Sequence, residues 1–195
     1  MTKDLIRQNY RKLRRSISSA EKTISSYAIT KIIINNNNNL NFYQKKIAVY
    51  LASDGELDLR LLIEALWKNQ GNVFLPVINA TTQALEFSPY FPETLIKINQ
   101  YGIHEPESDF FVSPEGLDVV FMPLVAFDKT GARLGMGKGY YDKSFAFCAE
   151  SQIKPILIGV AYSCQCCDKL PIDHWDIPLD GILTEKEFVM FNRKS

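Results

Sequence analysis

A glycine-rich segment carries the residues of this sequence that are best suited to bind phosphate. Glycines alternate at Gly135, Gly137 and Gly139, with Arg133 before them and Lys138 between the last two. Glycine lets a backbone approach a ligand closely and adopt positive φ angles. Arginine can grip phosphate oxygens with a fork of donors, and lysine supplies a point charge. The segment follows a predicted strand and opens a predicted helix, whose free N–H groups also favour phosphate.

Two standard nucleotide motifs do not fit this segment. A P-loop needs Ser or Thr after its Gly-Lys pair and an earlier glycine, but Gly139 follows Lys138 and Ala132 stands at the earlier position. A dinucleotide fingerprint needs a third glycine where this sequence has Tyr140. A flexible connection between strand and helix is the plainer alternative. The convergence of two cations and three glycines where α/β folds bind ligands favours a phosphate site.

Two carboxylates are candidate ligands for Mg²⁺, which usually takes one or two carboxylates together with phosphate oxygens and water. Asp142 lies in the first turn of the predicted helix, where it could equally serve only to stabilise the helix dipole. Asp176 lies two residues before Pro178, where it could equally form a turn. The residues alone leave these alternatives open.

Other polar residues lie where a ligand could reach them. Glu56 follows the first predicted strand and is either a solvated loop acid or a partner for donor groups on a heterocycle. Lys3 and Arg7 are four residues apart on one helical face, which is either solvated or folded over a nucleotide. His104 and His174 have no spaced partner, so we expect both to be structural.

The elements that must position these residues follow an α/β pattern. Short apolar runs predict strands over residues 47–51, 73–77, 85–90, 119–123, 156–162 and 182–183. Strands that alternate with helices favour a three-layer sandwich with a mostly parallel or mixed central sheet. We see no linker or repeat and expect one domain over residues 1–195. Ligands of such folds bind beyond the carboxyl ends of the strands.

The predicted helices begin with a basic one over residues 3–16. A capping-box pattern at Ser18 and Glu21 starts a second, which runs into five asparagines at 35–39, expected to be a loop. A third extends from a cap at Asp58 to Gly71, and a fourth covers 140–150. The core face of the first helix would use Leu5, Ile6, Leu13 and Ile17, and that of the second Ile24, Tyr27, Ala28, Lys31 and Ile32.

The composition is that of an ordinary globular domain. The chain has 195 residues, of which 46% are apolar and 23% charged, and 22 Lys and Arg balance 22 Asp and Glu. Zero net charge argues against binding nucleic acid by bulk attraction. There is no apolar run long enough to span a membrane and no secretory signal, so we expect a cytoplasmic protein. The four cysteines lack the paired spacing of a zinc site and are expected to be reduced thiols.

The chain resembles the 5-formyltetrahydrofolate cyclo-ligase family, also called methenyltetrahydrofolate synthetases. The strongest match is the signature Phe127-Asp128…Gly131…Arg133-Leu134-Gly135-x-Gly137-x-Gly139-Tyr140-Tyr141-Asp142. Weaker matches follow the expected order at Lys3…Arg7, Tyr50-Leu51…Gly55-Glu56-Leu57-Asp58, Leu75-Pro76, Ile103…Glu105-Pro106 and Pro171…His174…Asp176…Pro178-Leu179-Asp180. The resemblance therefore spans nearly the whole chain.

The resemblance implies an ATP- and Mg²⁺-dependent enzyme. Family members convert 5-formyltetrahydrofolate and ATP into 5,10-methenyltetrahydrofolate, ADP and phosphate. The formyl oxygen is thought to attack the γ-phosphate, after which N10 closes the ring and phosphate leaves. The implied fold is shared with sugar-phosphate isomerases and CoA transferases. The implied partners are these small molecules, with no nucleic acid and no membrane, and we expect a monomer.

The resemblance also assigns residues by position. The ATP contacts would be Lys3, Arg7, Arg133, Leu134, Gly135, Met136, Gly137, Lys138, Gly139, Tyr140 and Tyr141. The folate contacts would be Leu51, Glu56, Met136, Gly137, Lys138, Gly139 and Tyr140. Asp142 and Asp176 would be the Mg²⁺ ligands, and Arg133 and Lys138 would be catalytic by stabilising transition-state charge.

Two other functions stay open at this point, because a fold does not fix a function. A phosphosugar or CoA-type enzyme would need a positioned carboxylate base, for which Glu105 is the candidate. A nucleotide- or folate-binding protein without turnover would lack metal carboxylates, whereas Asp142 and Asp176 are present. The sequence therefore favours the ligase.

Overall fold

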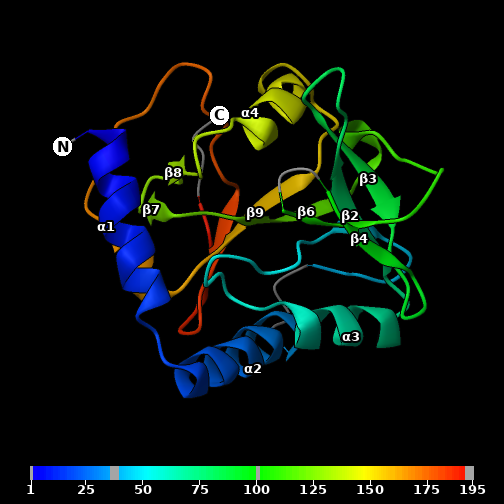
Figure 1. Ribbon diagram of the computed structural model, residues 1–195, viewed down its shortest axis with the longest axis horizontal. Coiled ribbons are helices and arrows are strands. Elements are labelled where there is room, and N and C mark those ends of the chain that lie inside the picture. The colour runs from blue at the N-terminus through cyan, green and yellow to red at the C-terminus, as the bar shows by residue number, and fades with distance from the viewer. Residues whose placement is uncertain (1, 36–39, 100–101, 192–195) are drawn as a thin grey trace.

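A seven-stranded sheet lies at the centre of the computed structural model, which describes residues 2–35, 40–99 and 102–191 (Figure 1). Its strand order is β12-β11-β9-β6-β1-β2-β3. The five inner strands run parallel, and the edge strands β12 and β3 are antiparallel to their neighbours. The strands are β1 (Lys46–Ala48), β2 (Asn72–Ile78), β3 (Leu85–Pro89), β6 (Val119–Pro123), β9 (Ile156–Val160), β11 (Gly181–Leu183) and β12 (Phe188–Met190). The prediction of a mostly parallel, mixed sheet is confirmed.

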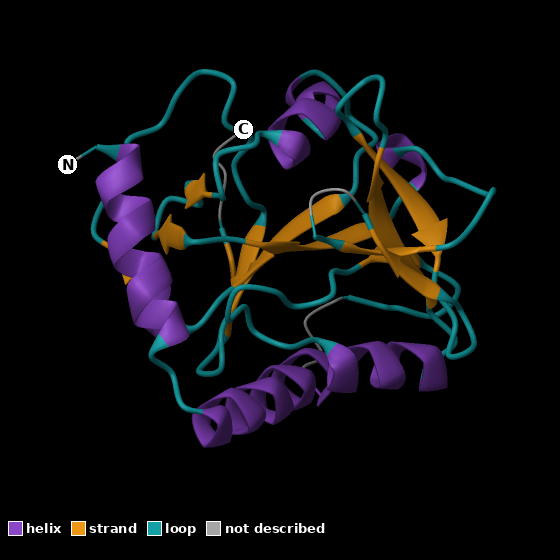
Figure 2. Cartoon of the chain, in the orientation of Figure 1, coloured by secondary structure: helices purple, strands orange, loops and turns teal. Residues whose placement is uncertain are grey.

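Helices cover both faces of this sheet, and each face has its own hydrophobic core (Figure 2). The helices are α1 (Lys3–Arg15), α2 (Ser19–Asn35), α3 (Arg60–Lys68) and α4 (Tyr140–Ser144), with 3-10 turns at Pro114–Gly116, Ala146–Ala149 and Ser163–Gln165. Because strand side chains alternate, Ile47 packs on the α2–α3 side and its neighbour Ala48 packs on the α4 side. None of the helices in the described ranges has the length and apolar character needed to cross a membrane.

Two smaller sheets were missed by the sequence prediction. One contains β7 (Ala126–Asp128), β8 (Arg133–Leu134) and β10 (Cys166–Cys167), and the other contains β4 (Ile96–Ile98) and β5 (His104–Pro106). The β7–β8 hairpin separates β6 from the glycine-rich segment, which therefore does not follow the central strand directly. These strands are two or three residues long, too short to show a period in the sequence.

The capping prediction for α2 is confirmed, and the one for α3 is not. Ser18 and Glu21 form the expected reciprocal box, in which each backbone N–H reaches the other side chain. The N-cap of α3 is Leu59, which makes no side-chain capping bond, so the prediction that Asp58 caps this helix was wrong by one residue. Asp58 Oδ1 still accepts from the N–H of Arg60 at 2.9 Å, and α3 ends before Gly71 as predicted. The expected helix over 140–150 is instead the five-residue α4 followed by a 3-10 turn. The asparagine run at 36–39 lies outside the described residues.

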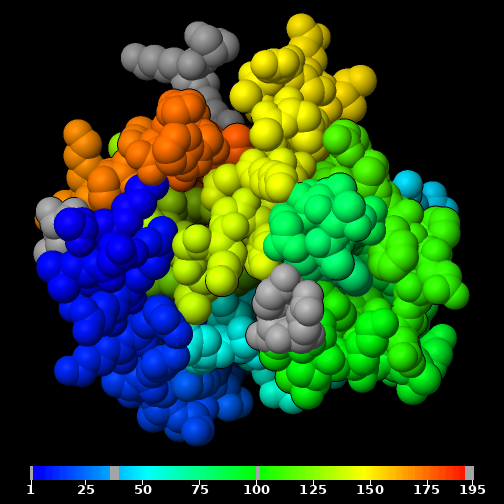
Figure 3. All heavy atoms as spheres, turned by 45° about the horizontal axis from the view of Figure 1, so that its top comes forward, coloured from blue at the N-terminus to red at the C-terminus, as the bar shows by residue number. Residues whose placement is uncertain are grey.

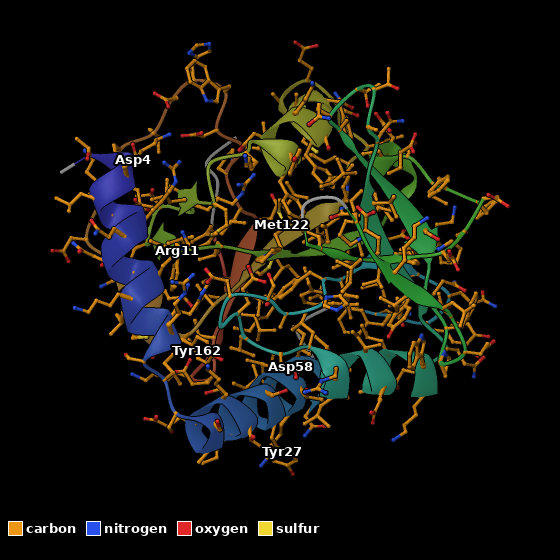
Figure 4. All side chains as sticks on the ribbon, viewed as in Figure 1. Asp4, Arg11, Tyr27, Asp58, Met122 and Tyr162 are labelled. Carbon is orange, nitrogen blue, oxygen red and sulfur yellow. The ribbon has the colours of Figure 1, made fainter. Side chains whose placement is uncertain are left out.

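The predicted core face of α2 was wrong at Ile24 and Tyr27, although Ile32 packs against the core as predicted. Ile24 and Tyr27 are 67% and 65% exposed, and Figure 4 shows Tyr27 on the outer side of the helix. The buried residues are Ser25, Ser26, Ile29 and Ile33. Apolar residues occur all round this helix, so their spacing does not select one face. The polar Ser26 can be buried because its Oγ donates to the carbonyl of Asp58 at 2.6 Å.

Candidate functional site

The helix α1 borders three loops that hold the predicted site residues. Thr2 caps its N-terminus by accepting from Leu5 N, and its last turn is basic, as the helix dipole favours. Its buried face packs Ile6 against Leu134 of β8. The predicted apolar stripe is confirmed at Ile6, which is buried, and at Ile17, which packs against the core. It was wrong at Leu5 and Leu13, which are 45% and 41% exposed. Figure 3 shows α1, residues near 135 and residues near 175 side by side on one face.

The glycine-rich loop begins from the β7–β8 hairpin, which Asp128 holds together. Asp128 is 1% exposed; its Oδ1 accepts from the N–H and hydroxyl of Thr130, and its Oδ2 accepts from the N–H of Leu170. Burial alone would raise the pKa of this carboxyl, but these hydrogen bonds outweigh burial and lower it. The hydrogen bonds of Asp128 therefore fix the backbone of the hairpin from which the Arg133 side chain extends.

Positive φ angles explain two of the three alternating glycines. Gly137 has φ +94° and Gly139 has φ +69°, a region that other residues rarely adopt. A Cβ on Gly137 would lie 3.2 Å from Cζ of Arg7, so a side chain here would press on that guanidinium. Gly135 has no such crowding, and its carbonyl accepts from Nε of Arg7 at 3.0 Å. Arg7 also pairs with Asp4 of its own helix.

Arg133 is buried and only partly partnered. Its side chain is 5% exposed, and its Nη2 donates to Oδ1 of Asp142 at 2.8 Å. Its Nε is buried and has no hydrogen-bond partner among the described residues. Buried donors are nearly always satisfied, so this atom marks a place where an acceptor belongs. The predicted contribution of the helix dipole is small, because α4 has only five residues.

Asp142 connects this loop to residues 171–180. Its Oδ1 accepts from both Arg133 and the N–H of Ile177, the latter at 3.1 Å. Its Oδ2 makes no hydrogen bond or ion pair within the described ranges. The carboxylate is thus oriented through one oxygen and presents the other to a ligand.

Asp176 is held in a similar way. Its Oδ2 accepts from Nζ of Lys3 at 2.6 Å and from the N–H of Asp173 at 2.8 Å, while Oδ1 has no partner in the described part of the chain. Lys3 also reaches Asp173 at 2.8 Å. Partial burial lowers the pKa of Lys3, but the hydrogen bonds and charges of the two aspartates outweigh it and raise the pKa above its ordinary value.

Asp142 and Asp176 have the donor chemistry of candidate ligands for a Mg²⁺ ion that phosphate would complete. Asp142 and Asp176 each present one unpartnered oxygen. No cluster of three or more His, Cys, Asp or Glu side chains in the described ranges could hold a metal ion without further ligands. Mg²⁺ commonly binds through one or two carboxylates with phosphate oxygens and water. The two aspartates could therefore hold this ion together with a nucleotide.

Glu56 is not the solvated acid that the sequence left open. Its side chain is 10% exposed, and its Oε2 accepts from the N–H and hydroxyl of Ser53 at 3.0 and 3.3 Å. Burial raises the pKa of Glu56, against the opposing effects of Ser53 and Arg14. Burial also raises the pKa of Tyr141, with Glu56 adding to this and Arg133 opposing it. Tyr141 therefore lies close enough to feel the charges of both Glu56, a predicted folate contact, and Arg133, a predicted ATP contact.

The remaining predicted residues lie on the same loops or near them. Met136 and Lys138 are exposed, and Lys138 makes no side-chain hydrogen bond or ion pair with any described residue. Leu51 is half-buried and packs against the core between the sheet and the helices α2 and α3. His104 lies exposed on β5, and His174 stacks edge-on against Trp175 on the outer part of its loop. Neither histidine takes part in the contacts described above.

Sequence reasoning missed Arg14 and Asp54. Arg14 is 1% exposed, and it binds Asp54 and lies 3.7 Å from Glu56. Its burial could have been inferred from the i, i+4, i+8 spacing of Ile6, Tyr10 and Arg14 on one helical face. Glu105, the candidate base of an isomerase, is buried, and its Oε1 accepts from the N–H of Ile78 and from Nδ2 of Asn99.

Comparisons with known proteins agree on one family. The model of the 5-formyltetrahydrofolate cyclo-ligase family matches residues 1–185. A 5-formyltetrahydrofolate cyclo-ligase of Haemophilus influenzae is 39% identical over 181 residues, which is 91% of this chain and 95% of that protein. Another, of Escherichia coli K12, is 42% identical over 141 residues, which is 71% of this chain and 76% of that protein.

Solved structures give the same result. The NMR structure of Aquifex aeolicus 5,10-methenyltetrahydrofolate synthetase aligns with a TM-score of 0.82 and 31% identity, over 100% of this chain and 95% of that one. The structure of a 5,10-methenyltetrahydrofolate synthetase from Mycoplasma pneumoniae aligns with a TM-score of 0.73 and 27% identity, over 95% and 99% of the two chains.

Proposed function

Because the chain belongs to the 5-formyltetrahydrofolate cyclo-ligase family, we propose that it converts 5-formyltetrahydrofolate and ATP into 5,10-methenyltetrahydrofolate, ADP and phosphate with Mg²⁺. The observation that carries the proposal is the Arg133–Asp142 pair. A buried guanidinium with an unpartnered Nε stands beside a carboxylate with an unpartnered oxygen, at the start of a glycine-rich loop. Such an arrangement suits a phosphate and its metal ion together.

Four cations would hold the nucleotide. Lys3 and Arg7 come from α1, Arg133 directly precedes the glycine-rich segment, and Lys138 lies within it. The loop from Gly135 to Tyr141 supplies backbone N–H groups without side chains at its glycines. Mg²⁺, held by Asp142 and Asp176, would neutralise phosphate charge. Lys3 and Arg133 form ion pairs with these same aspartates. With Mg²⁺ bound to the carboxylates, the two cations would be available to bind the phosphates.

In the reaction, the formyl oxygen attacks the γ-phosphorus of ATP, and the bond from phosphorus to the ADP oxygen breaks. N10 of the folate then attacks the formyl carbon, the bond between that carbon and the former formyl oxygen breaks, and phosphate leaves with this oxygen and, in the overall balance, with the proton of N10. Charge develops on the transferred phosphoryl group, and Arg133 and Lys138 would stabilise it. The protein's other task is to hold the two substrates in line, to which Arg133 would contribute from the β7–β8 hairpin.

The folate would lie between the glycine-rich loop and the loop that follows β1. Leu51 would contact its rings, and the carboxylate of Glu56 would accept hydrogen bonds from pteridine N–H groups. Residues 136–140 would border both substrates. Glu56 suits this role because its Oε1 makes no hydrogen bond within the described ranges, while Ser53 fixes Oε2.

The proposal includes one domain over residues 1–195 that works as a monomer in the cytosol, on small molecules and without nucleic acid. It also includes a relationship of the fold to that of sugar-phosphate isomerases and CoA transferases. A phosphosugar or CoA-type reaction is less well supported, because Glu105 is 4% exposed and bound by Ile78 and Asn99. A binder without turnover would not need the paired aspartates.

A turnover assay tests the proposal. Purified protein is mixed with 5-formyltetrahydrofolate, ATP and Mg²⁺, and the near-ultraviolet absorbance of the methenyl product is followed. We expect a rise that disappears when ATP is omitted or when EDTA is added. Binding of both substrates without any rise would identify a binding protein instead, and release of phosphate without the methenyl product would indicate a different acceptor.

A further inference from the structure

A buried arginine has no role in the proposed function so far. Arg14, in the last turn of α1, is 1% exposed, and charged side chains are rarely so buried unless they are well partnered. Its Nη1 donates to the carbonyl of Leu124 at 3.0 Å, and its Nε and Nη2 donate to the carbonyl and Oδ2 of Asp54 at 3.1 and 2.9 Å. Arg14 therefore ties the segment after β1 to the segment after β6.

Asp54 does not need Arg14 for its neutralisation. Arg11 donates to Oδ2 of Asp54 at 2.8 Å, and Arg15 forms a further ion pair with the same carboxylate. The charge of Arg14 is therefore in excess at Asp54. Glu56, whose Oε1 lies 3.7 Å from Nη1 of Arg14, is the other carboxylate that Arg14 meets within the described residues.

The distance of 3.7 Å matters for what Glu56 can do. It is close enough for strong electrostatic attraction in a buried site, but it is longer than a hydrogen bond. Oε2 is fixed by Ser53, and Oε1 makes no hydrogen bond within the described ranges. The Glu56 carboxylate is thus attracted by the charge of Arg14, while its Oε1 can still accept a hydrogen bond from a ligand.

The groups around Glu56 would otherwise favour its neutral form. Burial raises the pKa of Glu56, and the charge of Asp54 adds to this. Tyr50, two residues after β1, and Tyr141 on α4 remain neutral, because burial raises the pKa of each and the charge of Glu56 raises it further. Among the described residues, Arg14 is the cation that opposes these effects on Glu56.

We propose that Arg14 is a positioning residue for the folate substrate, which holds Glu56 as an oriented carboxylate whose Oε1 accepts from pteridine N–H groups. The inference rests on the proposed function, in which Glu56 contacts the folate. Arg14 itself does not touch the substrate. The positive φ angles of Asp54 and Gly55, +50° and +79°, show the turn that places Glu56 beside Arg14.

The test measures KM for each substrate in Arg14→Gln, Arg14→Lys and the control Arg11→Gln, which removes a cation from Asp54 without any contact to Glu56. We expect Arg14→Gln to raise KM for 5-formyltetrahydrofolate about tenfold, the effect of weakening a hydrogen bond to a charged group. KM for ATP stays within twofold. Arg14→Lys, which keeps the charge, recovers part of the loss, and Arg11→Gln changes neither KM.

Two further readouts separate positioning from simple structural support. The acid limb of kcat/KM for the folate moves up by about one pH unit in Arg14→Gln, because Glu56 loses the charge that keeps it ionised. In a Glu56→Gln background, Arg14→Gln adds less than twofold to the folate KM. Circular dichroism and thermal unfolding confirm that each variant is folded, and Arg14→Lys carries the comparison if Arg14→Gln is not.

Three results would overturn the inference: an unshifted acid limb, an equal rise in both KM values, or the same effect of Arg14→Gln with and without the Glu56 carboxylate. Failure of Arg14→Lys to fold would also overturn it, since Arg14 would then be a brace for the chain. An inactive wild-type protein would instead remove the proposed function. The two failures are therefore distinguishable.

Discussion

Nζ of Lys3 lies 2.6 Å from Oδ2 of Asp176, although 173 residues separate them in the chain. The other aspartate proposed for Mg²⁺, Asp142, is paired with Arg133 in the same manner at 2.8 Å. Each proposed metal ligand is thus neutralised by a cation proposed for the nucleotide. A metal ion bound by the two aspartates would free Lys3 and Arg133 to bind phosphate, and phosphate bound by these cations would free the aspartates to bind the metal ion. The binding of each would therefore favour the binding of the other.

Lys3→Gln tests this coupling, because its two expected effects have opposite signs. The variant loses a phosphate contact, so KM for ATP rises about tenfold. It also frees Asp176, so Mn²⁺ binds about threefold more tightly when nucleotide is absent, as expected for a partly exposed ion pair. Isothermal titration of Mn²⁺ alone gives the second value. Lys12→Gln is the control, since Lys12 is exposed on the same helix. Weaker metal binding in Lys3→Gln would contradict the exchange of partners.

Arg133→Ala tests the central cation. We expect kcat to fall by about 100-fold or more, because a preorganised donor to the transition state is lost. The fold should persist, since the β7–β8 hairpin is held by Asp128 and not by Arg133. Steady-state turnover and thermal unfolding are measured on the same preparation. A stable variant with wild-type kcat would remove Arg133 from the mechanism.

Gly137→Ala tests the close approach of the loop to α1. The added Cβ is strained at φ +94° and lies 3.2 Å from Cζ of Arg7, so we expect KM for ATP to rise several-fold as Arg7 is displaced. Gly102→Ala is a matched control, because it also has a positive φ, +75°, but its Cβ would meet no atom of the described residues within 4 Å. Each variant should lose about 1 kcal/mol of stability from backbone strain. An unchanged KM for ATP in Gly137→Ala would contradict a role for this contact.

Asp128→Asn tests how the hairpin is held, through the pH dependence of stability. The folded-state pKa of Asp128 is lowered, so its contribution is fully present above the unfolded pKa of about 4 and is lost as the pH falls through the folded pKa. At pH 7 we expect the free energy of unfolding to drop by about 2 kcal/mol in the variant, since charged hydrogen bonds are lost. The difference from wild type should narrow below pH 4.

Urea unfolding at pH 7 and at pH 3 checks this expectation. Asp109→Asn serves as the control, because Asp109 is exposed and makes no hydrogen bond or ion pair with other described residues. A difference between wild type and Asp128→Asn that is equally large at both pH values would show that the amide fails for reasons of shape and not of charge.

Local spacing in the sequence determined much of this protein. The capping box of Ser18 and Glu21 and the alternating glycines depend on residues a few positions apart, so they can be predicted without the rest of the chain. The inner strands are also clear, because a buried parallel strand must be a continuous apolar run. The short strands β4, β5, β7, β8, β10 and β12 were missed because two or three residues give no period.

Only the tertiary structure decided which faces are buried and which distant charges meet. Periodicity shows that a helix has a core face, but α2 has apolar residues on all sides, and the position of Asp58 selected the face with Ser26. Arg14 is buried because α1 meets the loop of Asp54 and Glu56, which lies about forty residues further along the chain. Lys3 and Asp176 pair for the same reason. Such contacts depend on how the elements pack, and spacing along the chain does not contain that information.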